Sequence, residues 1–276
     1  MGPMVAAPMR PKLAAKRQGG KRGTRQALAR RTAAVGALHR AAGSHRERRG
    51  QAVTQTAREK TLTHQQAKAF YDRLGRGQDW QGFYEDPPVR ALIEHGAFEK
   101  AGAVLEFGCG TGRLAERLLD GAMAAGARYV GMDISDTMIR LAEARLSRFG
   151  DRARVQRTAG SPRLDFEAGR FDRFVSTYVL DLLSAEDIRT VLQEAHRVLA
   201  DGGLLCLASL THGFTVPSRL LERAWMALYG LRPSLVGGCR PLGLPALLDD
   251  ARWRIRFQEK YSRWGVPTEA LIAEKR

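Results

Sequence analysis

The residues best placed to bind a ligand form a glycine loop between an apolar strand and a helix. The segment AVLEFGCGTGRLAERLL, residues 103–119, places Gly108, Gly110 and Gly112 directly after the strand. Glycine allows positive φ and leaves no Cβ between backbone and ligand, and the following helix offers free N–H groups. The spacing predicts a site for a small polar or partly anionic group. It also fits the dinucleotide pattern G-x-G-x-x-A, and a turn without a ligand is the structural alternative.

A single carboxylate follows at the end of the next predicted strand. Asp133 closes the segment RYVGMD (128–133), 21 residues after Gly112. A carboxylate at the tip of a second strand accepts both hydroxyl protons of a ribose, which suits adenosylmethionine and NAD alike. The loop and the carboxylate together indicate a nucleoside ligand without identifying it.

Strands and helices must alternate to position these residues. Short apolar strands alternate with helices of about 10 to 15 residues between residues 103 and 210, which predicts an α/β fold with a Rossmann-like, doubly wound and mostly parallel sheet. Two helices, over residues 63–75 and 86–96, cover the N-terminal side of the domain, and Asp86 is the expected N-cap of the second, with prolines in its first turn. Together the two helices form an N-terminal helical cap. A helix over residues 218–230 and strands over residues 253–261 and 270–276 follow.

Positive charge is concentrated at the start of the chain. The 276 residues carry 45 lysines and arginines against 29 acids, a net charge of +16, and residues 1–60 hold fifteen of the basic residues with only two acids. This segment has too few large apolar side chains to form a core, so we predict a disordered basic tail over residues 1–61 and one domain over residues 62–276. The tail has three interpretations: an inert extension, an organellar transit peptide, or a nucleic-acid arm, which its lack of aromatic side chains disfavours.

Composition and motifs exclude several classes of protein. The longest apolar run, GGLLCLASL, is far shorter than the roughly 18 residues of a membrane span, so we expect none. Cys109, Cys206 and Cys239 are too scattered for a disulfide framework or a zinc site, which favours a cytoplasmic location, or an organelle if the tail is a transit peptide. Hydrolase, kinase and metal-binding motifs are absent, and no metal is expected.

Four ordered blocks resemble the motifs of class I S-adenosylmethionine-dependent methyltransferases. They are EFGCGTG (106–112), GMD (131–133), RFDRFVSTYVLD (170–181) and EAHRVLADGG (194–203). The resemblance covers about residues 65–210 and is closest to the group acting on small molecules, such as ubiquinone, menaquinone and phospholipid methyltransferases. It implies a seven-stranded sheet of order 3-2-1-4-5-7-6 with an antiparallel last strand. An NAD enzyme has no reason to carry the last two blocks together.

The resemblance also implies which residues hold S-adenosylmethionine. The glycine loop would approach the methionine part, with Glu106 ordering the loop or binding the amino group, and Asp133 would bind the ribose. Ile134 would pack on the adenine, and residues leaving the fourth strand would lie beside the sulfonium and the acceptor. The complete predicted cofactor set is Glu106, Gly108, Cys109, Gly110, Gly112, Asp133, Ile134, Ser176 and Thr177.

One loop departs from the family pattern. Residues 158–164 offer Ala159 and Gly160 where many members have an acid that bonds to the adenine amino group. One missing hydrogen bond costs about 0.5–1.5 kcal/mol, so cofactor binding is still expected.

Methyl transfer chiefly needs donor and acceptor to be aligned away from water, so a dedicated catalytic side chain is not essential. For an acceptor that loses a proton, His212, just after the fifth predicted strand, is the predicted base; a surface histidine is the alternative. Tyr178 is predicted beside the cofactor and the acceptor, or packed against a substrate lid. Aromatic side chains of the cap and of helix 218–230 favour a small apolar or aromatic acceptor, although such a helical stripe is more often core. The alternatives are an RNA or protein methyltransferase recruited by the tail and a methyltransferase-like binding protein without turnover.

Overall fold

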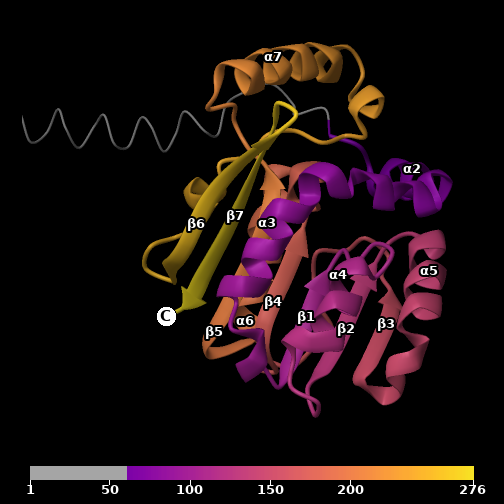
Figure 1. The fold of residues 1–276 in the computed structure, drawn as a ribbon, viewed down its shortest axis with the longest axis vertical. Coiled ribbons are helices and arrows are strands. Elements are labelled where there is room, and N and C mark those ends of the chain that lie inside the picture. Colours follow the sequence, from indigo (N-terminus) through magenta and orange to yellow (C-terminus); the bar gives the residue numbers. More distant parts are fainter. Residues whose placement is uncertain (1–60) are drawn as a thin grey trace, which may run out of the picture. The chain divides into compact units, whose positions relative to one another are not determined.

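A computed structural model of the chain describes residues 61–276 (Figure 1). The predicted basic tail and its three interpretations lie outside the described residues, except for residue 61. Seven strands form one sheet of order β3-β2-β1-β4-β5-β7-β6, as predicted. β1 to β5 run parallel to one another, and β7 is antiparallel to both β5 and β6. The strands are β1 Ala103–Phe107, β2 Arg128–Asp133, β3 Ala153–Arg157, β4 Phe171–Thr177, β5 Leu199–Leu210, β6 Trp253–Arg263 and β7 Val266–Lys275.

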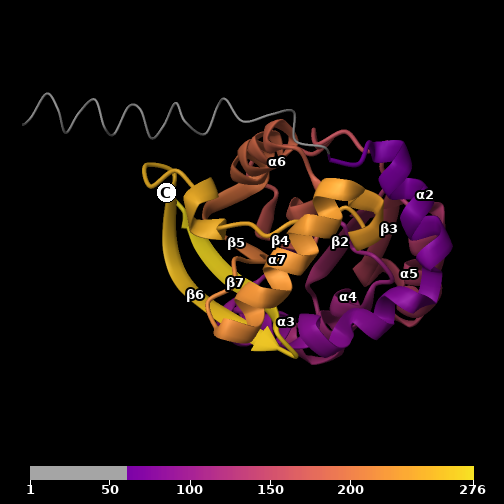
Figure 2. The ribbon, with the colours of Figure 1, turned by 90° about the horizontal axis from the view of Figure 1, so that it is seen from above.

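Helices cover both faces of this sheet, as its apolar strands require. Successive strand residues point to opposite faces, so Val104 packs in one core and Leu105 in the other. The first core also takes side chains of α3, α4 and α5, and the second takes those of α6, which lie on opposite sides of the sheet in Figure 2. The helices are α2 His64–Leu74, α3 Gly82–His95, α4 Arg113–Arg117, α5 Asp136–Leu146, α6 Ala185–Val198 and α7 Val216–Leu231.

Hydroxyl side chains fix where four of these helices begin. Thr63, Ser135, Ser184 and Thr215 each accept a hydrogen bond from the backbone N–H three residues later, which satisfies a donor that has no partner within the helix. In the part of the chain that is described, no helix combines the length and the apolar character that a bilayer crossing needs.

The start of α3 differs from the sequence prediction. The helix begins at Gly82, four residues before Asp86, and contains Pro87 and Pro88 in its interior. A 3-10 segment, Gly75–Gln81, already leads the chain into the helix, so no cap is needed at Asp86. The Asp86 carboxylate instead forms ion pairs with two arginines of α4.

Two aspartates tie the N-terminal cap to the carboxyl ends of the strands. Asp72 of α2 accepts a hydrogen bond from the Ser135 hydroxyl at 2.6 Å. Asp79 accepts from the Thr111 hydroxyl and from the Arg145 guanidinium, each at 2.6 Å. The cap therefore lies directly over the end of the sheet where the glycine loop and Asp133 are found.

Candidate functional site

The glycine loop follows β1 in a conformation that requires glycine. Gly108, Gly110 and Gly112 all have positive φ, between +51° and +81°. A Cβ on Gly108 would lie 2.1 Å from the Cγ2 atom of Val179, so no other residue fits there without displacing the neighbouring loop. The N–H groups of Gly108 and Cys109 donate to the Met132 carbonyl at 2.8 and 2.9 Å, which fastens the loop to the end of β2.

Asp133 holds the loop from the adjacent strand end. Its carboxylate accepts hydrogen bonds from the N–H groups of Gly110 and Ser135, each at 2.9 Å. Burial raises the pKa of Asp133, and these N–H groups offset only part of that rise. An ionised carboxylate has about four acceptor positions, so the two bonds leave capacity for a ligand hydroxyl pair.

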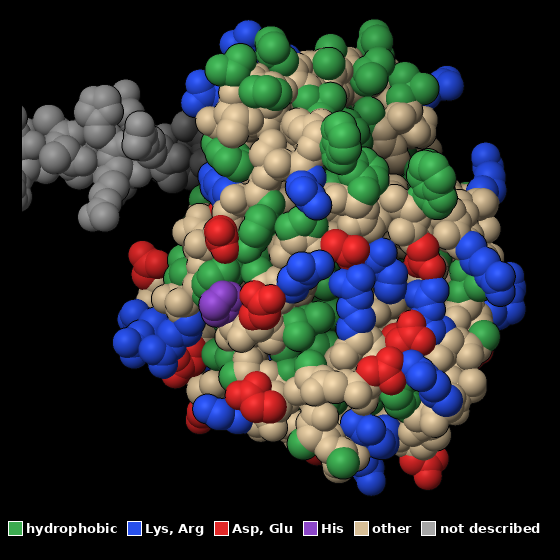
Figure 3. Space-filling view, in the orientation of Figure 1, with side chains coloured by type: hydrophobic (Ala, Val, Ile, Leu, Met, Phe, Trp, Pro, Cys, Tyr) green, Lys and Arg blue, Asp and Glu red, His purple; other side chains and the backbone are tan. Residues whose placement is uncertain are grey.

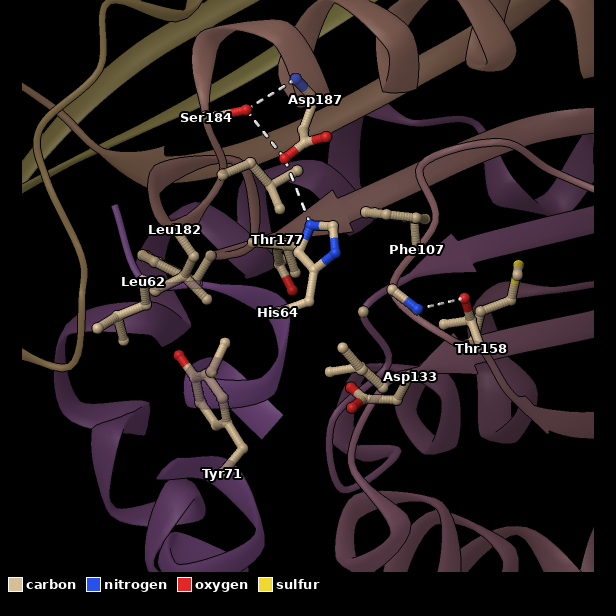
Figure 4. A pocket seen from close by; sticks show the side chains of 18 of the residues that line it. Leu62, His64, Tyr71, Phe107, Asp133, Thr158, Thr177, Leu182, Ser184 and Asp187 are labelled. Carbon is tan, nitrogen blue, oxygen red and sulfur yellow. Dashed lines mark hydrogen bonds and ion pairs between the residues drawn. The ribbon is translucent and has the colours of Figure 1, made fainter. Parts of the chain in front are cut away.

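A cleft opens above these two strand ends (Figure 4). About 830 Å³ of space lies within the cleft when the part open to solvent is included. Its floor comes from the ends of β1, β2 and β4, and its cover comes from α2 and the start of α6. The residues that line it include Leu62, His64, Tyr71, Gly108, Asp133, Ile134, Gly160, Thr177, Tyr178, Leu182 and Asp187.

A smaller polar chamber adjoins the cleft on the other side of the loop. Gly108, Thr177 and Tyr178 line both spaces, and Gly110 and Arg113 line the chamber. The chamber therefore places a guanidinium and a backbone loop next to the cleft, where a carboxylate or an amino group of a ligand could be held.

Comparison with known proteins agrees with this geometry. Residues 104–203 match the family model described as methyltransferase domain. A demethylmenaquinone methyltransferase of Lactococcus lactis is 31% identical over 110 residues, which are 40% of this chain and 42% of that enzyme. The match therefore spans less than half of the relative's length.

Solved structures establish the same fold. A methyltransferase of Methanosarcina mazei, described as SAM-dependent, superposes with a TM-score of 0.54 at 22% identity, covering 67% of this chain and 96% of the other. A putative methyltransferase of Haloferax volcanii, solved with the Trm112 methyltransferase activator, gives 0.59 at 14% identity, covering 76% and 97%. Residues 104–203 therefore match a methyltransferase domain, and the sheet has the fold of class I methyltransferases. The fold of this class implies S-adenosylmethionine as the methyl donor.

The structure brings part of the predicted cofactor set to the cleft. Gly108, Asp133, Ile134 and Thr177 line the cleft, as does Tyr178. Three further members of the predicted set, Glu106, Cys109 and Gly110, line the polar chamber instead. The remaining two lie elsewhere: Gly112 packs near Ala142 of α5, and the Ser176 hydroxyl is buried and donates to the Phe107 carbonyl at 3.0 Å.

Glu106 lies below the loop rather than in the cleft. It is buried and accepts a hydrogen bond of 2.5 Å from the Tyr129 hydroxyl. Burial raises the pKa of Glu106 to about 8, and the charge of Asp133 also raises it, although the hydrogen bond from Tyr129 limits the rise. Glu106 also lines the polar chamber, so both predicted roles, ordering the loop and binding the amino group, stay predictions.

Tyr178 is held rigidly at the end of β4. It has a positive φ of 56°, and its ring packs edge-on against Tyr84 with centroids 5.7 Å apart. No group within residues 61–276 meets full hydrogen-bond geometry at its hydroxyl, although Thr268 lies near enough to lower the pKa of that hydroxyl. Burial raises the pKa of this hydroxyl well above its ordinary value. Tyr178 is therefore neutral at neutral pH and can donate a hydrogen bond, and its predicted place beside the cofactor and the acceptor stays a prediction.

Two carboxyl groups lie near these aromatic side chains, the partly buried Glu85 and the buried Asp181. Burial raises the pKa of Glu85 to about 8 and that of Asp181 to about 7, and both charges act on Tyr178. The N–H groups of Asp181 and Leu210 and the charge of Arg240 lower the Asp181 value. Even so, neither Asp181 oxygen has a described partner that meets hydrogen-bond geometry. A proton is therefore readily held on this side of the cleft near neutral pH.

The structure places His212 outside the lining of the cleft. Its side chain is 62% exposed, and its Nδ1 lies 2.8 Å from Oε1 of Glu222 on α7. The cleft is lined instead by residues that the sequence analysis did not predict. His64 of α2 reaches across it, with Nε2 3.4 Å from Oδ2 of Asp187 on α6 (Figure 4). The only sequence signal for His64 is that its helix precedes the first strand.

The predicted aromatic wall forms only in part. Tyr71 lines the cleft, whereas Trp80 and Phe83 are exposed. Trp225 packs inward from α7 and donates from Nε1 to the Cys239 carbonyl at 2.9 Å, and Tyr229 is buried. No group of three or more histidine, cysteine or acidic side chains suited to a metal ion occurs among the described residues.

Proposed function

We propose that the chain transfers a methyl group from S-adenosylmethionine to a small apolar or aromatic acceptor. The observation that carries the proposal is the cleft between the bare backbone of Gly108 and the carboxylate of Asp133, at the switch point of a sheet with the class I strand order. The residues present fit the cofactor. Gly108 has no side chain where the methionine part would approach the backbone, and the carboxylate of Asp133 can accept hydrogen bonds from the ribose hydroxyls.

Bound S-adenosylmethionine supplies a methyl group that its positive sulfur has already activated. The chain's part is to align the two reactants and keep water out. Asp133 would bind the ribose hydroxyls, and Ile134 and Gly160 would form the flat apolar end that receives the base. Thr177 and Tyr178, at the end of β4, would flank the reacting carbon, because they line both the cleft and the chamber.

The walls of the cleft support an apolar acceptor. Leu62, Leu182 and the ring of Tyr71 lie on the side away from the glycine loop (Figure 4). The name of the relative from Lactococcus lactis, demethylmenaquinone methyltransferase, agrees with such an acceptor. Glu222 holds His212 outside the cleft. His212 would therefore act as a base only for an acceptor that extends beyond the mouth of the cleft.

Calorimetry with S-adenosylhomocysteine tests cofactor use. Asp133→Ala should weaken binding by roughly tenfold or more, since a hydrogen bond to a charged group contributes about 1.5–3 kcal/mol. Asp201→Ala, at a carboxylate that is 97% exposed, is the matched control and should bind like the wild type. Wild-type protein that does not bind the compound would end the proposal.

Methyl-labelled donor and a fractionated cell extract test the acceptor. The label should enter the organic-soluble small molecules. Label in the RNA or protein fraction would support recruitment of a macromolecule instead, and cofactor binding without any labelled product would indicate a binding protein without turnover.

A further inference from the structure

One face of α7 is apolar and exposed along the whole helix. Val216, Leu220 and Leu231 are 70%, 59% and 77% exposed, and Ala224 and Ala227 lie between them. These positions recur every three or four residues, so they form one stripe. Figure 3 shows hydrophobic side chains gathered at the end of the molecule that α7 covers. A contiguous exposed apolar surface of this kind marks an interaction site.

The opposite face of α7 is already packed on the domain. Ser218 and Tyr229 are buried there, and Trp225 donates its hydrogen bond to Cys239. The helix is therefore held in place by its inner face, and its outer face is not needed for the core.

The tip of the β6–β7 hairpin extends the same surface. Trp264 at the tip is 87% exposed. The next residue, Gly265, lies beside the start of α7, where a Cβ would be 3.7 Å from Leu221 and 3.8 Å from the Pro217 carbonyl. We use the name α7 face for the surface formed by Val216, Leu220, Ala224, Ala227, Leu231 and Trp264.

Unpaired positive charge borders the α7 face. Arg219, Arg223 and Arg232 are exposed, and none of them has an ion pair with an acid of residues 61–276. Glu222, the single acid of α7, is engaged by His212 and by the N–H of Gly213. Apolar side chains flanked by arginines are typical of a helix that lies in the interface of a bilayer.

A groove beside α7 also combines apolar side chains with arginines. It runs between α2 and the segment after α7, and its walls include the apolar side chains of Leu62 and Phe70. Arg73 and Arg232 also line it, and none of its described lining residues is acidic. Leu62 lines the main cleft too, so the groove and the cleft are neighbours.

We propose that the α7 face docks on a lipid bilayer with an anionic surface. An apolar stripe buried among acyl chains and arginines at headgroup level match that surface in both polarity and charge. A second copy of the chain would set arginines against arginines. The first 60 residues contain fifteen basic residues and two acids, so their net charge is positive, like that of the arginines beside the α7 face. They would therefore be repelled by this face and attracted to the same anionic membrane. Docking does not depend on the proposed methyl transfer.

Vesicle sedimentation of the full chain tests the proposal. The chain should bind phosphatidylcholine vesicles that contain about one third phosphatidylglycerol more strongly than pure phosphatidylcholine vesicles, and salt should weaken the binding. Leu220→Glu with Leu231→Glu should reduce binding at least tenfold. Each of Arg219→Gln, Arg223→Gln and Arg232→Gln should reduce it by about fivefold.

Two tryptophans offer a matched control. Trp264 and Trp80 are each 87% exposed, but only Trp264 belongs to the α7 face. Trp264→Glu should weaken binding, and Trp80→Glu should not, while circular dichroism should show both variants folded. Unchanged binding of the Leu220→Glu, Leu231→Glu variant would assign the membrane contact to the basic residues 1–60 and overturn the proposal. A wild-type dimer that this variant dissociates would overturn it in favour of a second copy.

Discussion

The floor and the cover of the cleft are built from different kinds of residue. The floor, at the ends of β1, β2 and β4, depends on backbone conformation and backbone hydrogen bonds around Gly108 and Asp133. The cover, made by α2 and the start of α6, depends on side chains such as His64, Tyr71 and Asp187. The floor thus suits one unvarying ligand, whereas the cover can change its side chains and with them the acceptor.

Changing Gly108 should have the largest effect. Gly108→Ala puts a methyl group against Val179 at a backbone φ of +81°, which costs about 1–2 kcal/mol in conformational strain alone and shifts the loop. We expect S-adenosylhomocysteine binding to fall more than a hundredfold by calorimetry. Gly121→Ala, where a Cβ meets no atom within 4 Å, is the control. Equal binding by the two variants would show that the floor does not depend on its backbone.

Removing the buried acid under the floor should stabilise the protein at alkaline pH. Burial raises the pKa of Glu106 from 4.5 to about 8, so the folded protein keeps a proton that the unfolded chain releases. Stability is therefore lost as pH rises from about 4.5 to about 8. Glu106→Gln should exceed the wild type by about 1–3 kcal/mol at pH 8 and by little at pH 5, measured by urea unfolding.

The matched control for this change is Glu143→Gln, at an exposed position of α5, which should follow the wild type at both pH values. If Glu106→Gln unfolds more readily than the wild type at pH 8, the carboxylate is ionised and bound in the folded protein, and the floor contains an acid that acts as a ligand group.

Loosening the cover should show the opposite pH dependence. Burial would raise the pKa of Asp72, but hydrogen bonds from Lys68 and Ser135 outweigh it and lower the value from 3.8 to about 2. The stability that Asp72 contributes is present above about pH 4 and is lost as pH falls towards 2. Because this side chain is 28% exposed, we expect Asp72→Asn to cost only about 1 kcal/mol at pH 6 and nothing at pH 2, again by urea unfolding.

A variant that loses as much at pH 2 as at pH 6 would show that Asp72 acts by packing and not by charge. Ligand affinity separates the two regions further, since Asp72→Asn should change S-adenosylhomocysteine binding far less than Gly108→Ala does.

His212→Ala should have the smallest effect. The side chain is mostly exposed and paired with Glu222, so stability should change by less than about 0.5 kcal/mol. Once an acceptor is known, kcat should stay within about twofold of the wild type. A large fall in kcat with an unchanged KM would instead assign the acceptor's proton to His212 and bring the segment after β5 into the reaction.

The same contrast between floor and cover explains what the sequence could predict. The glycine loop and Asp133 could be predicted because a turn with positive φ and an acid at a strand end are recognisable from a few neighbouring residues. The strand order of the sheet could be predicted because the four blocks occur in the order of the methyltransferase motifs. Ser176 was harder, since one position in a strand decides whether a side chain faces the cleft, as Thr177 does, or a neighbouring strand.

Contacts within the cover could not be predicted from local sequence patterns. His64 and Asp187 are 123 residues apart in sequence, and no spacing rule connects them. The exposed apolar stripe of α7 was likewise indistinguishable from a core stripe, because the sequence pattern gives the periodicity of a helix but not which side is packed. The start of α3 at Gly82 was hidden because the preceding 3-10 segment has no capping residue.

The bond between Asp72 and Ser135 joins residues 63 positions apart, and it has a consequence for how the molecule assembles. During synthesis α2 leaves the ribosome well before the strand and helix on which it rests. Its mean hydropathy is low and it buries no residue fully, so it has little reason to hold its shape alone. We therefore expect the lid of the pocket to settle only after β2 and α5 have formed, which makes ligand-binding competence a late event in folding.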